Sequence, residues 1–202
     1  LPGHSESAAG GLTSGIEMPR NASPPTINAH HVARKQAVVR QTAVIDVGLW
    51  GGLVENNLAD LAGLSDGGVL AFKAFMSDSA SDFPRADDDI IYAGLQYAAE
   101  HGTVVGVHCE NEYITRSLKE QLQAAGRTDM AAWPESRPPF QELEAIDRAL
   151  HLARAAGGHL HVVHVSQGEG MRKIVQARNE GVRVTNETCP QYLLLDHDDY
   201  LR

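Results

Sequence analysis

The sequence predicts an α/β fold, and three features of it support that prediction. Short apolar runs alternate along the chain with longer amphipathic stretches, as expected for parallel strands joined by crossover helices. Several of the apolar runs lack polar alternation, which is typical of strands that are covered on both faces. Glycines follow the amphipathic stretches at Gly102 and Gly157, where helices commonly end in a residue that tolerates positive φ.

Six strands are expected, and each is a short apolar run between polar or turn-forming segments. In chain order they cover residues 12–17, 42–47, 68–75, 103–109, 159–165 and 182–186. Helices are expected over residues 87–101 and 141–156, which carry apolar side chains such as Ile91 and Leu150 at helical spacing. The acidic run beginning at Asp87 suits the N-terminus of the first of these helices.

A long connection, residues 110–140, separates the fourth and fifth expected strands. It begins with an expected helix over residues 111–125 and contains a proline-rich loop at residues 136–139. Such a connection follows the C-terminal end of a strand, where functional residues of parallel α/β proteins gather. A complete (β/α)8 barrel takes about 250 residues. We therefore expect residues 1–202 to form a single, incomplete catalytic barrel domain of about six βα units.

Composition and charge narrow the classes of partner. With 17 Lys and Arg against 26 Asp and Glu, the formal net charge is −9, which argues against nucleic acid or an anionic membrane as partner and favours a small molecule. No apolar run reaches the roughly 18 residues of a membrane span, and the first residues carry no signal-peptide pattern. The two cysteines, Cys109 and Cys189, form no disulfide framework. We therefore expect a cytoplasmic protein.

Lys73 lies within an apolar strand, between Phe72 and Ala74. Burial there would desolvate the amine, lower its pKa and favour the neutral form, which can capture carbon dioxide. The resulting carbamate carries a negative charge and two oxygens, and such a ligand can bridge two divalent cations. The alternative is a lysine that extends its amine to solvent.

His108 and His164 are the candidate imidazole ligands that accompany Lys73. His108 follows Lys73 by 35 residues, close to one βα repeat, and His164 follows after the long connection, so all three fall at the same end of consecutive strands. A buried, hydrogen-bonded histidine is the alternative for each. Strand alternation predicts that His159 and His161 face the helices, on the side opposite His164.

Several segments together resemble the cyclic amidohydrolases, the family that includes allantoinases, dihydropyrimidinases (hydantoinases) and dihydroorotases. The segments are AGGLT at 9–13, EMP at 17–19, FKAFM at 72–76, VHCEN at 107–111, HVVHVS at 161–166 and ETCPQYL at 187–193. They follow the family's order and cover nearly the whole chain. The resemblance implies a TIM-like barrel with two divalent metal ions, usually zinc. Carbamylated Lys73, made with CO2, would bridge the ions, and His108 and His164 would bind the second one.

Within the family, the sequence is most similar to allantoinases. Hydantoinases typically carry a tyrosine five residues beyond the carbamylated lysine, and this chain has Asp78 there. The segment at 18–21 favours the same group and makes Asn21 a candidate substrate-binding residue, whereas Gln191 is commoner in hydantoinases. The resemblance implies hydrolysis of a cyclic amide or ureide, allantoin to allantoate in purine catabolism, by a homodimer or homotetramer.

The chain also departs from the family pattern. The family's first strand supplies a His-x-His metal-binding pair and its eighth strand an aspartate that is both ligand and general base, and neither is matched here. We therefore expect a fragment that lacks the first and last barrel strands and that is inactive alone. Three alternatives stay open: a dihydropyrimidinase or hydantoinase, a non-catalytic hydantoinase-like scaffold, and a one-metal deaminase without a carbamylated lysine.

Overall fold

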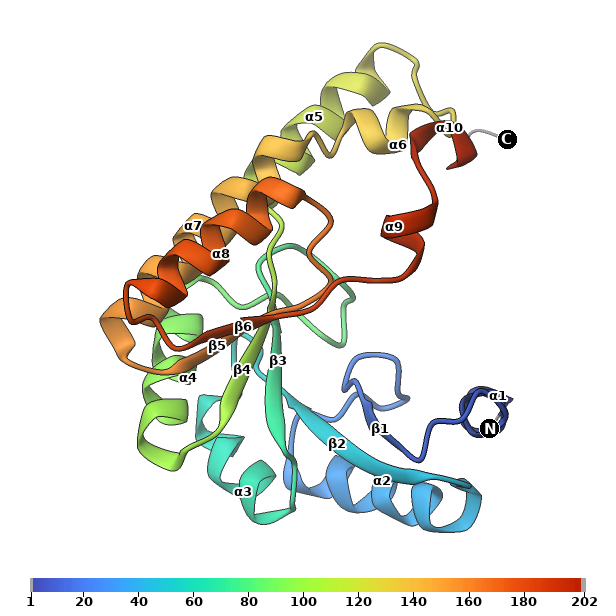
Figure 1. Cartoon of the computed structure of the whole chain (residues 1–202), viewed down its shortest axis with the longest axis vertical. Helices are drawn as coiled ribbons and strands as arrows, with labels where there is room; N and C mark the ends of the chain where they lie inside the picture. The colour runs from blue at the N-terminus through green and yellow to red at the C-terminus, as the bar shows by residue number, and fades with distance from the viewer. Residues whose placement is uncertain (1, 201–202) are drawn as a thin grey trace.

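A computed structural model describes residues 2–200 and contains one six-stranded sheet, drawn in Figure 1. All neighbouring strands are parallel, and their order in the sheet is their order in the chain. The strands are β1 (Ser14–Glu17), β2 (Asp46–Gly52), β3 (Ala71–Phe75), β4 (Val104–His108), β5 (His159–Val162) and β6 (Val184–Asn186). This is the sheet of a partial parallel barrel, as the sequence predicts.

Helices connect successive strands and flank the sheet at both ends of the chain. They are α1 (Pro2–Ala9), α2 (Ala29–Thr42), α3 (Leu61–Asp66), α4 (Asp88–His101), α5 (Glu112–Ala124), α6 (Ala132–Glu135), α7 (Pro139–Ala156), α8 (Gly168–Asn179), α9 (Gln191–Leu194) and α10 (His197–Tyr200). A short 3-10 helix, Leu58–Asp60, precedes α3. Among the residues described, no helix is both long and apolar enough to cross a membrane.

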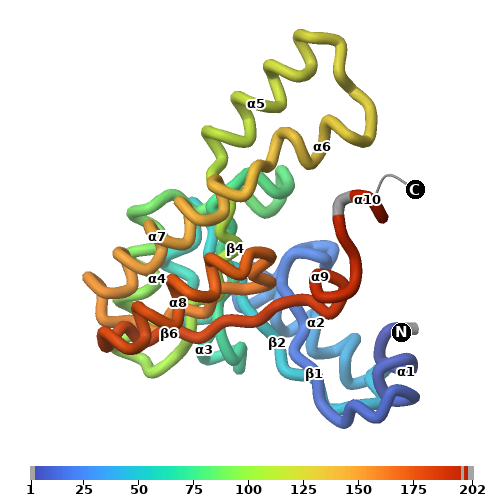
Figure 2. The backbone as a smooth tube through the Cα atoms, turned by 45° about the horizontal axis from the view of Figure 1, so that its top comes forward, coloured from blue at the N-terminus to red at the C-terminus, as the bar shows by residue number. Residues whose placement is uncertain are grey.

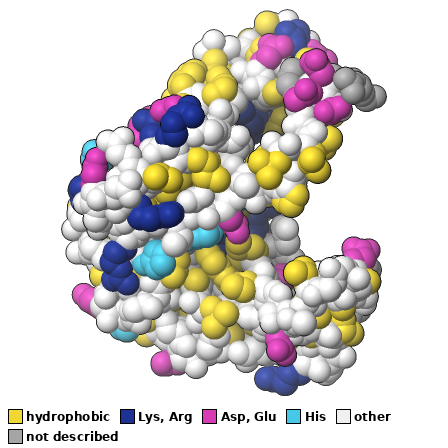
Figure 3. All heavy atoms as spheres, viewed as in Figure 1, with side chains coloured by type: hydrophobic (Ala, Val, Ile, Leu, Met, Phe, Trp, Pro, Cys, Tyr) yellow, Lys and Arg dark blue, Asp and Glu magenta, His cyan; other side chains and the backbone are white. Residues whose placement is uncertain are grey.

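The sheet curls, and its convex face packs against the connecting helices (Figure 1). The core on that face joins strand residues such as Phe72 and Leu160 to helix residues such as Leu95 and Ile146, all of which are fully buried. Burial of each of these side chains contributes about 1.5–3 kcal/mol. The opposite side of the curl is open, and Figure 3 shows the molecule hollowed there.

Parallel register assigns the residues of the concave face. Lys73 of β3 pairs with Gly106 of β4, which pairs with His161 of β5, and partnered residues of parallel strands point to the same face. Gly106 is required at its position, because a Cβ atom there would lie 2.2 Å from Cζ3 of Trp50. The Trp50 ring in turn meets the His161 ring edge-on, with centroids 6.2 Å apart. The Trp50 ring therefore fills the space over Gly106, beside the polar residues of the concave face.

The long connection after β4 forms a projecting arm. α5 and α6 extend away from the sheet, and the chain returns through residues 136–138 into α7 (Figure 2). The helix expected over 111–125 is confirmed as α5, and Asn111 caps it by accepting a hydrogen bond from the backbone N–H of Ile114. Both ends of this arm lie beside the C-terminal ends of the strands.

Most expected elements are confirmed, but several strand boundaries differ: β1, β3 and β6 start two to three residues later than expected, and the differences are larger at β2 and β5. The helices expected over 87–101 and 141–156 are α4 and α7, and both end at glycines with positive φ, Gly102 and Gly157. The second strand starts four residues later than expected and continues to Gly52, because α2 extends to Thr42. β5 ends at Val162 rather than at 165, since the chain turns away there.

Candidate metal centre

His108 and His164 meet at the mouth of the concave face. His108 is the last residue of β4, and His164 lies in the turn just after β5. Nδ1 of His108 lies 3.0 Å from Nε2 of His164, and the ring centroids are 4.8 Å apart. The structure therefore brings together two imidazoles that are 56 residues apart in the sequence.

The backbone of His164 has an unusual conformation. Its φ is 40°, in the left-handed region that residues with a side chain seldom adopt. The flanking residues are held on both sides: the N–H of Val163 donates to Val107 O at 3.3 Å, and the N–H of Val165 donates to Glu187 O at 2.8 Å. This turn redirects the His164 side chain toward His108, so strand alternation does not apply to it.

Lys73 lies on the same concave face and is only 3% exposed. Nζ of Lys73 donates to Ala74 O at 2.6 Å and lies 3.6 Å from the centroid of the Phe75 ring. That ring also contacts the His108 ring, with centroids 5.0 Å apart. Burial lowers the pKa of Lys73 well below its usual value, as expected for an amine placed among apolar strands.

Burial also lowers the pKa of each histidine. For His164 the pKa falls to about 4, through burial first and then through the charges of His108 and Lys73. For His108 burial lowers the pKa, although the hydrogen bond to Glu110 opposes this effect. The two imidazoles are therefore neutral at pH 7, which is the form that binds metal ions.

Glu110 and Arg137 extend the site beyond the two histidines. Oε2 of Glu110 lies 2.9 Å from Nε2 of His108, and Nε of Arg137 lies 3.2 Å from Oε1 of Glu110. Burial alone would raise the pKa of Glu110, but its hydrogen bond to His108 and the charge of Arg137 lower it below the usual value. Glu110 is therefore an ionised carboxylate at neutral pH.

A cavity of about 280 Å³ opens beside these groups. It is lined by both histidines, by Arg137 before α7, Glu142 of α7, Ser166 before α8 and Tyr192 of α9. Glu142 accepts hydrogen bonds from the backbone N–H of Ser166 at 2.8 Å and from the Ser166 hydroxyl. Ser166 and Tyr192 belong to the segments at 161–166 and 187–193 that carry the family resemblance, and Arg137 lies in the long connection after a strand end. Strand and helix periodicity alone give no sign that these residues line a cavity.

The donor set at the centre fits a divalent cation. Two nitrogens bound to one tetrahedral zinc ion at 2.0–2.1 Å would lie about 3.3 Å apart, close to the 3.0 Å between Nδ1 of His108 and Nε2 of His164. Within residues 2–200, no group of three or more His, Cys, Asp and Glu side chains could hold a metal ion. Lys73, on the same concave face, is the nearby residue of another type that could supply a further ligand.

The expected orientation of His159 and His161 is wrong. The buried residues of β5 that face the helices are Leu160 and Val162, so His159 and His161 occupy the concave side with Lys73. Nδ1 of His161 lies 2.9 Å from Oγ1 of Thr185. The prediction failed because it applied the alternation of β5 to His164, which lies beyond the end of that strand.

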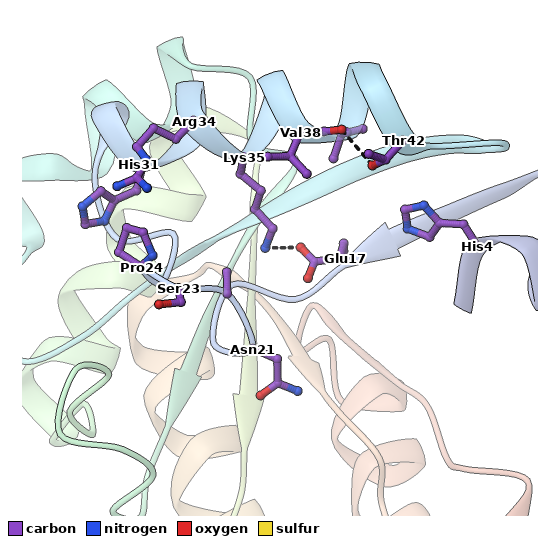
Figure 4. Close-up of a pocket in the computed structure, with 12 residues that line it drawn as sticks. His4, Glu17, Asn21, Ser23, Pro24, His31, Arg34, Lys35, Val38 and Thr42 are labelled. Atoms are coloured by element: carbon purple, nitrogen blue, oxygen red, sulfur yellow. Dashed lines mark hydrogen bonds and ion pairs between the residues drawn. The ribbon is translucent and has the colours of Figure 1, made fainter. Parts of the chain in front are cut away.

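Asn21 lies in a different cavity from the two histidines. That cavity, of about 420 Å³, is formed by the 21–24 loop, β1 and α2, as Figure 4 shows. Its wall includes an ion pair between Lys35 and Glu17. The structure thus brings Lys73, His108 and His164 to one face and leaves Asn21 apart from the histidine cavity.

No protein-family model matches the chain. The chain is 45% identical over 196 residues to an allantoinase from Solibacter usitatus and 43% identical over 196 residues to one from Deinococcus radiodurans. These alignments cover 96% of this chain but only 43% and 44% of the relatives, so the chain spans less than half of their length.

Solved structures resemble the chain over the same extent. An L-hydantoinase (dihydropyrimidinase) from Arthrobacter aurescens superposes with a TM-score of 0.93 and 41% identity, over 97% of this chain and 44% of its own. A D-hydantoinase superposes with a TM-score of 0.88 and 30% identity, over 98% of this chain and 44% of its own. The fold of this chain is therefore shared with part of both structures.

Proposed function

Because this chain belongs to the cyclic amidohydrolase family, we propose that it forms the metal-binding part of a hydrolase that opens a cyclic amide ring, with allantoin as substrate. The observation that carries the proposal is the facing pair of Nδ1 of His108 and Nε2 of His164, 3.0 Å apart, beside the buried amine of Lys73. Two neutral imidazoles and a lysine with a lowered pKa make a set of donors for divalent cations.

Lys73 acts in this proposal as a carbamate. Its neutral amine attacks carbon dioxide, an N–C bond forms, and one proton leaves the nitrogen for solvent. The side chain then carries one negative charge on two oxygens, which suits the space between two cations. The buried position favours this chemistry because it keeps the amine in its nucleophilic, uncharged form.

His108 and His164 would hold the second cation, and the Lys73 carbamate would hold both. Divalent cations bound there, zinc by the family resemblance, would lower the pKa of a water molecule and polarise a carbonyl oxygen. The side chains of this chain bind and orient: His108 is fixed by β4 and His164 by its clamped turn. The proton for the leaving nitrogen comes from an aspartate that the resemblance implies and that none of the matched segments supplies.

Allantoin is favoured over hydantoin by one feature of the site. Asp78 occupies the position where hydantoinases typically carry a tyrosine, and its side chain points to the surface, 69% exposed and 3.4 Å from Arg85. It therefore offers no hydroxyl donor to a ring oxygen. The curated relatives at 43–45% identity are named allantoinases, which supports the same substrate.

Hydantoin hydrolysis is the second candidate, because the structural neighbours at TM-scores of 0.93 and 0.88 are hydantoinases. Product formation separates the two candidates. A zinc-loaded protein that joins this chain to the first and last barrel strands implied by the family resemblance is supplied with allantoin or hydantoin at equal concentration, and the ring-opened acid is measured. The proposal expects faster turnover of allantoin, and preference for hydantoin would overturn the substrate assignment. An unreactive protein without bound metal would support a scaffold role.

We also propose that the protein acts in the cytoplasm as a homodimer or homotetramer. The two free cysteines, Cys109 and Cys189, suit a reducing compartment. Exposed apolar side chains such as Trp133 on the projecting arm and Phe140 at the start of α7 suit contacts between subunits. Light scattering of the purified protein measures the assembly, and a monomer at all concentrations would contradict it.

A further inference from the structure

Glu110 lies between a candidate metal ligand and the projecting arm. One carboxylate oxygen faces Nε2 of His108 at 2.9 Å, and the other faces Nε of Arg137 at 3.2 Å. Glu110 is two residues beyond His108, whereas Arg137 lies between α6 and α7, where the chain returns from the arm. The base of the arm is thus tied to the end of β4 through one carboxylate.

This arrangement determines which ring nitrogen of His108 carries the proton. An ionised carboxylate only accepts hydrogen bonds, so Nε2 of His108 must be the protonated nitrogen that donates to Glu110. Nδ1 then presents a lone pair toward Nε2 of His164. Without a cation, the Nε2–H of His164 donates a hydrogen bond to that lone pair. With a cation, Nδ1 of His108 is already in the form that binds.

Arg137 restricts the position of Glu110. Its guanidinium carbon lies 3.5 Å from the centroid of the Trp133 ring, and one of its terminal nitrogens donates to the Ser136 hydroxyl at 2.7 Å. The Ser136 hydroxyl in turn donates to Trp133 O at 2.7 Å. Because the planar guanidinium of Arg137 is stacked on the Trp133 ring and hydrogen-bonded at its edge, it has little freedom to move. The Glu110 carboxylate that it binds therefore has a defined position.

We propose that Glu110 and Arg137 are positioning residues for the candidate metal centre. Glu110 fixes His108 as the tautomer protonated at Nε2, and Arg137, stacked on Trp133, holds Glu110 in the orientation that does so. This inference rests on the proposed function, because it assigns the metal-binding role to Nδ1 of His108. It extends that function to two residues that act through His108. Hydrogen bonds of this kind orient metal-binding histidines and raise their affinity.

The test reads the tautomer of His108 directly. Protein labelled with ¹⁵N at histidine is examined without metal by NMR, where the two ring nitrogens of each tautomer have distinct shifts, and His108→Asn identifies the signals. The variants are Glu110→Gln, which removes the charge, and Arg137→Lys, which keeps the charge but loses the planar stack. Glu135→Gln is the matched control, because this exposed carboxylate on the same arm pairs with Arg127 and not with His108.

The wild type and Glu135→Gln are expected to have His108 protonated at Nε2. Glu110→Gln is expected to give a mixture of both tautomers and to weaken the binding of zinc about 10–100-fold, with a smaller loss in Arg137→Lys. If both variants keep the wild-type tautomer, Glu110 and Arg137 do not position His108 and the inference is wrong. Should Glu110→Gln fail to fold, the tautomer of His108 in Arg137→Lys decides whether the inference holds, since the Arg137 side chain is partly exposed.

Failure of the proposed function has a separate signature. A wild-type protein that binds no zinc contradicts the metal centre, and zinc titration detects this without reference to the tautomer. A wild-type protein that binds zinc, together with an unaltered His108 tautomer in both variants, contradicts only the positioning role. The two outcomes come from different measurements and are distinguishable.

Discussion

Nδ1 of His108 lies 3.0 Å from Nε2 of His164, so the two imidazole rings face each other. Within the strands of the sheet, successive residues point to opposite faces. His108 reaches this position by ordinary strand alternation. His164 reaches it by a turn with φ of 40° that follows the last residue of β5. The pair therefore depends on one regular element and one strained one, and each can be tested separately.

The strained turn predicts an order of stability among variants at residue 164. His164→Asn should be more stable than His164→Ala by about 1 kcal/mol, because asparagine tolerates the left-handed region and alanine does not. Chemical denaturation measures the free energy of unfolding. At His151, an exposed position within α7, the order should reverse, since alanine is the better helix former. An equal effect at both positions would show that the φ of 40° costs nothing.

Acid should destabilise the fold through His164. Its pKa is about 4 in the folded chain and about 6.5 in the unfolded one, so between these values the unfolded chain binds a proton that the folded chain does not. The free energy of unfolding should therefore fall as the pH drops from about 6.5 to about 4, by on the order of 1–3 kcal/mol, and this contribution should be constant above that range.

Denaturation of metal-free protein at several pH values checks this dependence. His164→Asn should have a shallower slope between pH 6.5 and 4, because it lacks the titrating group. His151→Asn serves as the control and should retain the wild-type slope. Identical slopes in all three proteins would show that a group other than His164 causes the loss of stability in acid.

Lys73→Ala should abolish most turnover by a zinc-loaded protein that joins this chain to the first and last barrel strands implied by the family resemblance. We expect a loss of more than about 100-fold, since loss of even an outer hydrogen-bond partner of a metal ligand costs 10–100-fold. Propionate or acetate added to the variant should restore part of the activity by supplying the missing carboxylate oxygens. Lys119→Ala, at an exposed position on α5, is the control. Unchanged metal content and turnover in Lys73→Ala would contradict the carbamate and favour a one-metal site.

Gly106→Ala should destabilise the protein by about 1–3 kcal/mol through overpacking. The added Cβ atom would lie 2.2 Å from Cζ3 of Trp50, and the ring has little room to move because it also packs against His161. Thermal unfolding of the single variant, of Trp50→Phe and of the double variant measures the coupling. The double variant should be more stable than the two separate losses predict, and simple additivity would contradict the contact.

The sequence was sufficient to predict the strand-end residues but not what surrounds them. Lys73 and His108 lie inside regular strands, so apolar neighbours and the βα repeat locate both. The contact of Glu110 with Arg137 joins residues on opposite ends of the arm, and no local periodicity encodes such a contact. Asn21 came from resemblance alone, and the 21–24 loop carries it into a separate cavity.

The error at β5 has a similar physical origin. Alternation predicts faces only while the backbone stays extended, and β5 ends at Val162. Extrapolating the pattern to His164 therefore assigned His159 and His161 to the helix side. The buried pair Leu160 and Val162 occupies that side instead. Hydrophobicity of these two residues, compared with their histidine neighbours, would have given the correct faces.

The central claim is that Lys73, His108 and His164 hold divalent cations together. A crystal structure of the protein grown with zinc and bicarbonate, with anomalous data collected at the zinc edge, tests it most directly. The account predicts a zinc ion about 2.0–2.1 Å from both Nδ1 of His108 and Nε2 of His164, with carbamate density extending from Nζ of Lys73 to it. Zinc bound only at other histidines, beside a free lysine amine, would contradict the account.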